Sequence, residues 1–221
     1  MRNLYKSVGV FLLGIALTFN VACSKDDDGP GDQLGRVGTL SMKIDGKLWE
    51  ADIATIMTVG DQEVEDGEDV AYWVNMSGVK VLNAGSDEAA ESISLSLLLT
   101  EAGFSNPKRS FPVDSMAEMD YGHGVILYNN RAESEAQGQG LYVSMHPEDT
   151  DLSVGNITIK DYEIGNQSFF GQLLGKGYTK LSGTFEAALY SYDGTDNPPK
   201  KITITEGKFN LNSDLLSGFG G

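Results

Sequence analysis

The segment that decides the fold class is a short alternating run near residue 40. Residues 40–50 read LSMKIDGKLWE, with apolar and polar side chains alternating up to Asp45-Gly46 and with Leu48 and Trp49 after it. Period-two alternation is typical of a half-buried β-strand, and Asp-Gly favours a type I′ turn because both central residues of that turn need positive φ. A two-residue turn places Trp49 opposite Met42. The segment therefore predicts a β-hairpin with one buried face.

The same period continues along the chain from about residue 37. Residues 92–100 (SISLSLLLT) place four apolar side chains on one face, and Leu98 interrupts the polar face, which predicts a central strand partly covered on both sides. We expect further strands at 70–76, 79–82, 109–113, 125–128, 141–145, 157–160 and 184–190, and a short amphipathic helical turn only at 115–121. The pattern predicts a single antiparallel all-β domain, either a β-sandwich or a small β-barrel.

A second hairpin is expected near the C-terminus. Residues 202–211 read ITITEGKFNL, and their four large apolar side chains share a face only if the alternation shifts by one at Glu206-Gly207. A two-residue turn produces that shift and places Ile204 opposite Phe209. Because Glu is a poor first residue for a type I′ turn, a one-residue bulge at Gly207 is the alternative.

The composition restricts the partners and the chemistry. The 221 residues include 16 Lys and Arg against 32 Asp and Glu, two His and one Cys. A formal charge of −16 argues against nucleic acid, since phosphate binding needs clustered basic side chains. One Cys excludes a disulfide framework and a four-cysteine zinc site.

The N-terminus has the pattern of an export signal. Arg2 and Lys6 precede an apolar run at 8–19, which is the length of a signal-peptide core and too short to span a bilayer. The run ends just before the only cysteine, Cys23. This pattern resembles a bacterial lipoprotein signal, which implies removal of 1–22 and acylation of Cys23, and two or three acyl chains give stable anchoring. The alternative is an ordinary secretory leader followed by an unmodified cysteine.

An acidic stretch follows the cysteine directly. It consists of Ser24, Lys25, Asp26, Asp27 and Asp28. It resembles the export tag of Bacteroidota lipoproteins, which directs them to the outer face of the outer membrane; the alternative is a solvated acidic spacer. Residues 29–33 (GPGDQ) have a linker composition. We therefore expect a signal peptide at 1–22, a lipidated flexible acidic tether at 23–36, a β domain at 37–214 and a tail at 215–221.

Motifs for catalysis are scarce. Neither His123 nor His146 belongs to a His-Glu-x-x-His pair, and the chain has no Gly-x-Ser-x-Gly nucleophile elbow. Residues 171–177 (GQLLGKG) lack the spacing of a phosphate-binding loop and are expected to form a turn. The acidic loop at 193–197 lacks EF-hand spacing, so we expect a plain turn there rather than a calcium site. We predict no catalytic residue, no metal and no cofactor.

Two weaker signals concern the surface. Asp114-Ser115-Met116 resembles the Asp-Ser/Thr-apolar sequence at which Bacteroidota glycosylate exported proteins. Paired aromatic residues at 72–73, 169–170 and 190–192 offer rings that can stack on sugars. We expect each pair to place one ring in the core and one at the rim.

Four short blocks carry a family resemblance. They are 44–51 (IDGKLWEA), 155–159 (GNITI), 181–187 (LSGTFEA) and 205–210 (TEGKFN). Together they resemble a group of Bacteroidota lipoproteins with a domain of unknown function, over about 38–212, although members often have Asn where this chain has Glu206. The resemblance implies a lipidated β domain and supplies no activity.

These patterns favour a non-catalytic, surface-exposed outer-membrane lipoprotein. Its β domain is expected to bind a glycan or another envelope protein. The first alternative is a structural or assembly subunit that acts through a sheet edge, and a less favoured one is a glycoside hydrolase that uses loop carboxylates.

Lipidation of Cys23 is directly testable. Cells that express the wild-type chain should incorporate labelled palmitate into it, whereas Cys23→Ala should take up none, because the acylated thiol is gone. Equal labelling of both proteins would contradict the lipoprotein interpretation.

Overall fold

A computed structural model describes residues 38–60, 71–81, 91–107, 109–115, 120–130, 140–145, 152–169, 172–192 and 199–213. These ranges contain strands β1 (Thr39–Ile44), β2 (Lys47–Glu50), β3 (Ile53–Gly60), β4 (Ala71–Lys80), β5 (Glu91–Thr100), β6 (Ser110–Val113), β7 (His123–Asn130), β8 (Leu141–Val143), β9 (Gly155–Phe169), β10 (Gln172–Ser191) and β11 (Lys201–Asn212), and helix α2 (Glu101–Ser105). No helix in this part of the chain is long and apolar enough to cross a membrane. The leader, Cys23, the acidic stretch 24–28, His146 and the loop 193–197 lie outside the described residues.

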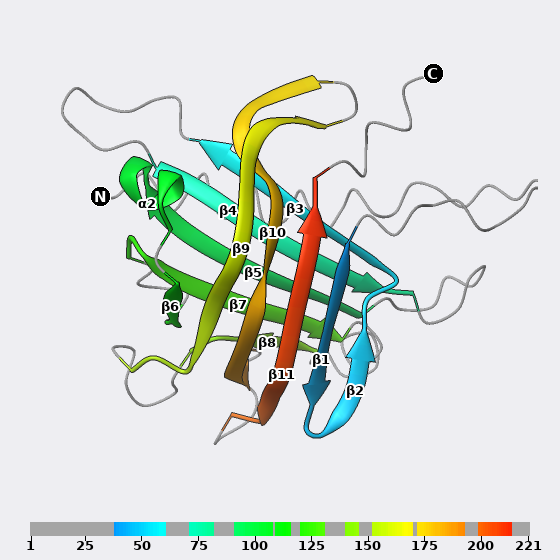
Figure 1. Cartoon of the computed structure of the whole chain (residues 1–221). Helices are drawn as coiled ribbons and strands as arrows, with labels where there is room; N and C mark the ends of the chain where they lie inside the picture. Colours follow the sequence, from blue (N-terminus) through cyan, green and yellow to red (C-terminus); the bar gives the residue numbers. More distant parts are fainter. Residues whose placement is uncertain are drawn as a thin grey trace, which may run out of the picture. The chain divides into compact units, whose positions relative to one another are not determined.

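The strands form one sheet that folds into two layers (Figure 1). Its order is β2-β1-β11-β10-β9-β6-β7-β5-β4-β3, and β8 pairs with both β10 and β7. Strands β9, β10, β11, β1 and β2 cross the strands of the other layer at a steep angle (Figure 1). Since β6 and β8 each pair with a strand of both layers, they join the layers along one side. The all-β prediction is confirmed, with features of both a sandwich and a barrel.

One pairing departs from the expected antiparallel sheet. Strand β6 pairs antiparallel with β9 but parallel with β7, through Val113 and Gly124. The sheet is therefore mixed through this one parallel pairing, whereas β8 pairs antiparallel with both β10 and β7.

The first hairpin is confirmed in type and register. Asp45 and Gly46 both have positive φ, at 48° and 81°, and Trp49 pairs with Met42. Trp49 is 3% exposed. Its indole Nε1 is the one buried side-chain nitrogen or oxygen, within the described ranges, that lacks a hydrogen-bond partner. Packing rather than hydrogen bonding therefore holds this ring.

The corner after β2 carries the chain from one layer to the other. The Ala51 N–H donates to the Leu40 carbonyl of β1 at 2.9 Å, and the next N–H, from Asp52, donates to the Val79 carbonyl of β4 at 2.8 Å. Two successive backbone N–H groups thus form hydrogen bonds with strands of opposite layers. Strand β3 begins directly after this corner.

The C-terminal segment is one strand and not the predicted hairpin. In β11, Glu206 has φ 53°, and the pairing with β1 moves from Ser41–Lys208 to Lys43–Thr205. The pairing with β10 skips at the same place. This is the bulge alternative, with the positive φ at Glu206 instead of Gly207. Both edges of β11 are paired with other strands, so the segment has no need to fold back on itself.

The bulge leaves the predicted faces intact but changes the partners. Phe209 is 3% exposed as expected, yet it pairs with Leu40 of β1 and Gly183 of β10 rather than with Ile204. A Cβ built on Gly183 would lie 2.5 Å from the Phe209 ring. Gly183 is therefore required because the ring lies directly over the backbone there.

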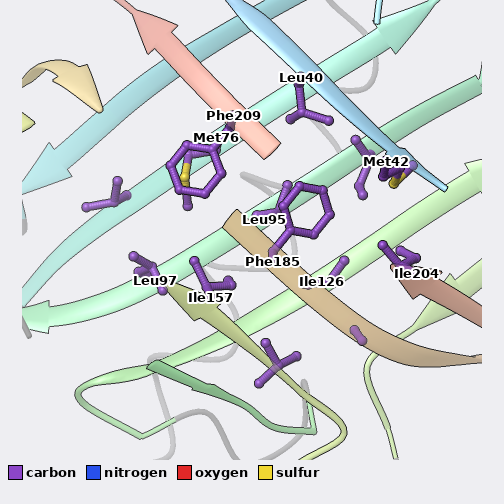
Figure 2. Close-up of a cluster of buried hydrophobic side chains, with 14 of the residues drawn as sticks. Leu40, Met42, Met76, Leu95, Leu97, Ile126, Ile157, Phe185, Ile204 and Phe209 are labelled. Carbon is purple, nitrogen blue, oxygen red and sulfur yellow. The ribbon is translucent and has the colours of Figure 1, made fainter. Parts of the chain in front are cut away.

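The core lies between the two layers (Figure 2). The Phe185 and Phe209 rings, 6.4 Å apart, project from one layer. They meet side chains of the other, including Met76, Leu95 and Ile126. Leu98 is buried on the opposite face of β5 whereas Ser92 and Ser94 on that face are half-buried, which confirms that this central strand is partly covered on both sides.

Several predicted boundaries are wrong. Residues 70–76 and 79–82 belong largely to a single strand, β4, because Gly78 allows close packing (Ala51 Cβ at 3.1 Å from a built Cβ) and makes no turn. The short strands expected at 157–160 and 184–190 extend to 15 residues in β9 and 20 in β10, and the expected turn at 171–177 is mostly the start of β10. Helix α2 and strand β3 were not predicted. The helical turn expected at 115–121 lies mostly outside the described residues.

A buried polar network around Gln167 and Tyr178 holds the β9–β10 hairpin against β3. The Gln167 side chain accepts from the Thr58 N–H at 2.8 Å and donates to the Tyr178 carbonyl at 2.6 Å, while the Tyr178 N–H donates to the Thr58 hydroxyl at 3.1 Å. The Tyr178 hydroxyl donates to the Phe104 carbonyl of α2 at 2.6 Å. Burial raises the Tyr178 pKa well above its ordinary value, so the hydroxyl stays a donor.

Truncation of the ring over Gly183 tests this packing. Phe209→Ala should lower the free energy of unfolding by about 3–5 kcal/mol, because a buried ring is lost and a cavity remains. Urea unfolding followed by tryptophan fluorescence measures the change. Leu48→Ala is the control, since Leu48 is 65% exposed and its loss should cost less than about 0.5 kcal/mol. Similar midpoints for the two variants would contradict the inward placement of Phe209.

Candidate functional site

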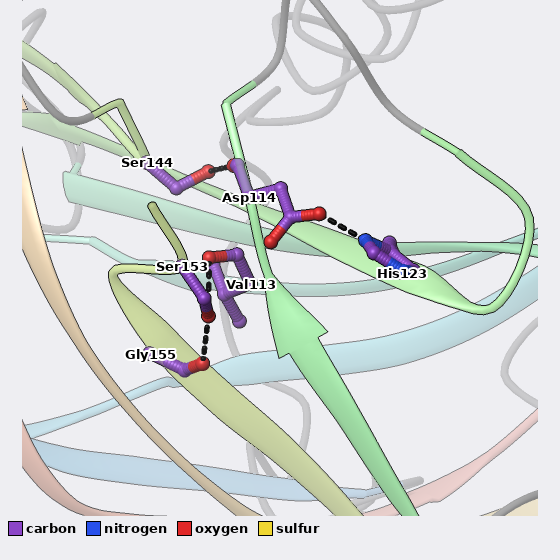
Figure 3. Close-up of polar contacts among 6 residues, drawn as sticks. All are labelled: Val113, Asp114, His123, Ser144, Ser153 and Gly155. Atoms are coloured by element: carbon purple, nitrogen blue, oxygen red, sulfur yellow. Dashed lines mark hydrogen bonds and ion pairs between the residues drawn. The ribbon is translucent and has the colours of Figure 1, made fainter. Parts of the chain in front are cut away.

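A carboxylate–imidazole pair lies where β6 ends and β7 begins (Figure 3). The Asp114 carboxylate Oδ2 contacts His123 Nδ1. The backbone holds both residues, because the Asp114 N–H donates to the Gly124 carbonyl at 2.9 Å and Gly122 makes a positive-φ turn before His123. The imidazole is about one third exposed and the carboxylate less so. From the sequence, His123 was assigned to no catalytic or metal-binding motif, and its partner was not predicted.

The nearby serines act as structural links. Ser144 Oγ donates to the Asp114 carbonyl at 2.8 Å and accepts from the Ile126 N–H at 3.1 Å. Ser153 Oγ lies 3.1 Å from the Val113 carbonyl and 2.9 Å from the Gly155 carbonyl (Figure 3). These hydroxyls are committed to backbone groups of the strand junction, so neither is placed as a nucleophile for His123.

The pair itself can orient a ligand. A carboxylate on Nδ1 fixes the imidazole ring and holds the proton of the neutral tautomer on Nδ1, which leaves Nε2 to accept one hydrogen bond. A serine-type triad also needs a hydroxyl or thiol at hydrogen-bond distance from the imidazole. Within the described ranges His123 makes no such contact. Ser115 is 1% exposed, so its hydroxyl is inaccessible to a glycosyl group in the folded domain.

Metal ligands do not gather in this part of the chain. Among the residues that the structure describes, no group of three or more His, Cys, Asp or Glu is placed to hold a metal ion.

The aromatic candidates divide between core and surface. Tyr72 stacks on Phe104 with ring centroids 4.2 Å apart, and Tyr178 and Tyr162 extend the same cluster, so these rings are structural. Trp73 is half-buried on β4. The Phe170 side chain lies outside the described residues.

A second cluster faces solvent across β8 and β10. We call Leu141, Tyr190 and Tyr192 the Tyr192 patch. The Tyr192 N–H donates to the Leu141 carbonyl at 3.0 Å, and the two side chains are 55% and 39% exposed. Tyr190 is half-buried two residues away on the same strand face, with Lys201 Nζ 6.0 Å from its ring centroid. The sequence had indicated the tyrosine pair but not Leu141, which reaches it through strand pairing.

The two strands at the ends of the sheet order, β2 and β3, offer little room for strand addition. Strand β2 has four residues, including Lys47 and Glu50, and short charged edges resist pairing. On β3, the Thr58 N–H is bound by Gln167 of the β9–β10 hairpin. Residues 160–169 of β9, by contrast, pair with no described strand other than β10, so this strand keeps one long edge without a strand partner in the described ranges.

Comparison with known proteins adds no assignment: no family model, curated protein or solved structure matches this chain.

The division of roles around Asp114 can be tested by two substitutions. Ser144→Ala should lower stability by about 1–3 kcal/mol, because it leaves the buried Ile126 N–H without its side-chain partner. Asp114→Asn should cost less than about 1 kcal/mol, since the pair that it weakens is partly exposed. Urea unfolding of both variants checks this order, and the reverse order would make the Asp114–His123 pair a main support of the junction.

Proposed function

We propose that this protein is a lipid-anchored outer-membrane protein, facing the cell exterior, whose β domain binds a neutral glycan without catalysis. The anchor is Cys23 and the export tag is 24–28, as argued from the leader and the acidic stretch. The observation that carries the binding role is the Tyr192 patch.

The composition of the patch favours a sugar. Tyr190 and Tyr192 lie about 7 Å apart along one strand face, which is the i to i+2 spacing of a β-strand. Tyrosine rings stack on the apolar faces of sugars, and their hydroxyls add hydrogen bonds at the edge. The chain's charge of −16 would repel anionic polysaccharides, so a neutral glycan fits best.

The hydrogen bonds made by the polar side chains near His123 also agree with a binding role. The hydroxyls of Ser144 and Ser153 hold backbone, and the Asp114–His123 pair has no nucleophile at hydrogen-bond distance within the described ranges. A partner that is bound and not cleaved requires only complementary surface.

The test uses the full chain in detergent with soluble neutral oligosaccharides: cello-, malto-, xylo- and manno-oligosaccharides. At least one should bind the wild type, and Tyr192→Ala should weaken that binding about tenfold, because the stacking ring is lost. Isothermal titration measures the dissociation constants.

The matched control is Tyr121→Ala, which removes a tyrosine that is 48% exposed elsewhere. It should bind as the wild type does. Equal weakening by both variants, or no binding of any of the four oligosaccharide classes, would contradict the proposal.

A further inference from the structure

The outer face of the layer formed by β3, β4, β5 and β7 carries no carboxylate, lysine or arginine along its described strands. Alternate residues point away from the core there, at odd numbers in 53–59, 73–79 and 123–129 and at even numbers in 92–98. None of these positions is Asp, Glu, Lys or Arg, although 22% of the chain is charged. The outer face of the other layer carries charged side chains, including the exposed Lys208. We call the uncharged positions the Trp73 face.

The centre of the Trp73 face holds a set of hydrogen-bonded polar side chains. The Asn75 amide Nδ2 donates to Ser94 Oγ at 2.7 Å and to Ser96 Oγ at 3.0 Å, and its Oδ1 accepts from the Ser77 hydroxyl. Since both serine oxygens act as acceptors here, each hydroxyl retains a proton to donate. Within the described ranges neither Ser94 nor Ser96 donates to another group. The centre therefore offers a ligand two hydroxyl donors held in place by Asn75.

An indole ring and an imidazole flank this centre. Trp73 and His123 both pair with Leu98, one from β4 and the other from β7, and each is a diagonal neighbour of Ser96. Diagonal neighbours in a sheet lie about 7–8 Å apart. Asp114 holds His123 Nδ1 (Figure 3), which leaves Nε2 to accept a hydrogen bond, and the imidazole is about one third exposed. An aromatic ring, two donors and an acceptor thus lie within about 10 Å, the width of two strand intervals.

Strand pairing joins the Trp73 face to the Tyr192 patch. Ser94 pairs with Leu127 of β7, and Leu127 pairs with Val143 of β8. Val143 pairs in turn with Tyr190 of β10. Paired residues lie side by side, so the row from Ser94 to Tyr190 crosses three strand intervals, about 14 Å, and contains no charged residue. One uncharged surface of the sheet therefore connects the two groups of side chains.

We propose that the Trp73 face is a second subsite for the glycan that the Tyr192 patch binds, so that the ligand is an extended neutral chain and not a single sugar. The inference rests on the proposed glycan binding. The indole ring stacks on the apolar face of a sugar, the serine hydroxyls donate to its oxygens, and His123 Nε2 accepts from its hydroxyl groups. Asn75 and Asp114 hold these groups before the ligand arrives, which lowers the entropic cost of binding.

A chain gains affinity by contacting both groups of side chains. Once the Tyr192 patch holds one end, contact with the Trp73 face becomes intramolecular and adds to the affinity. From Tyr190 to Trp73 the sheet extends over four strand intervals and four residues along β4, up to about 24 Å. A disaccharide is too short to touch both, whereas a hexasaccharide is long enough. Affinity should therefore rise with chain length.

The experiment uses the full chain in detergent and the class of oligosaccharide that binds it, as a disaccharide and as a hexasaccharide. In isothermal titration the wild type should bind the hexasaccharide at least about tenfold more tightly. Trp73→Ala should remove this gain and leave disaccharide binding unchanged. Ser94→Ala should weaken hexasaccharide binding about threefold, because one hydrogen bond is lost. The matched control is Ser182→Ala, which removes a half-buried hydroxyl from the outer face of β10 and should bind as the wild type does.

Tryptophan fluorescence provides a test that needs no substitution. The chain has two tryptophans, and Trp49 is 3% exposed, so acrylamide reaches mainly Trp73. A saturating hexasaccharide should lower the quenching constant about twofold, because the sugar covers one face of the ring. A saturating disaccharide should leave the quenching constant unchanged.

The outcomes separate this inference from the proposed function. If the disaccharide binds, Tyr192→Ala weakens it and both lengths bind equally, the second subsite is overturned and the Tyr192 patch stands. If neither length binds, both proposals fail. If the disaccharide also shields Trp73, the face is a separate site and the shared chain is overturned. If Trp73 is shielded in the glycan-free protein, either at every concentration or as protein concentration rises, the chain itself or a second copy covers the face and the inference is overturned.

Discussion

A buried glutamine side chain takes the place of a strand partner between the two layers. The Gln167 side chain accepts a hydrogen bond from the Thr58 N–H and donates one to the Tyr178 carbonyl, and the Tyr178 N–H donates to the Thr58 hydroxyl. Side chains thus form hydrogen bonds with backbone groups that a neighbouring strand would bind in a sheet. Each buried polar group left without a partner would cost about 1–3 kcal/mol, so loss of one of these side chains also destabilises the groups that it pairs with. The covered edge of β3, the rings around Phe104 and the direction of the β9–β10 hairpin all depend on it.

The sequence predicted what local chemistry controls. The Asp45-Gly46 turn and the buried faces of 202–211 follow from φ preferences and period two, and both are observed. It did not predict β3, because the inward face of that strand carries Ala54, Ile56 and Thr58 while larger apolar side chains face outward. Thr58 is buried for its hydrogen bonds to residues more than 100 positions away, and no local pattern encodes that distance. The bulge at Glu206 has the same origin, since strands on both sides supply its pairing.

The candidate sites show the same limit. Asp114 and His123 are only nine residues apart, but their contact depends on the parallel bridge between β6 and β7, which the all-antiparallel expectation did not contain. In the Tyr192 patch, the alternation of β10 indicates Tyr190 and Tyr192, whereas Leu141 joins them through the pairing of β8 with β10. The spacing of the sequence indicated single side chains. Which residues lie beside them depends on the pairing of the strands, which the sequence did not predict.

The position of β1 has a mechanical consequence. This strand is paired on both edges, with β2 and with β11, and the chain enters it at Thr39. A pull on the preceding segment is directed along the strand, so it loads the hydrogen bonds to both neighbours together instead of opening them one at a time. The domain would therefore resist force applied through its N-terminal end better than force that peels β2 away from its single neighbour.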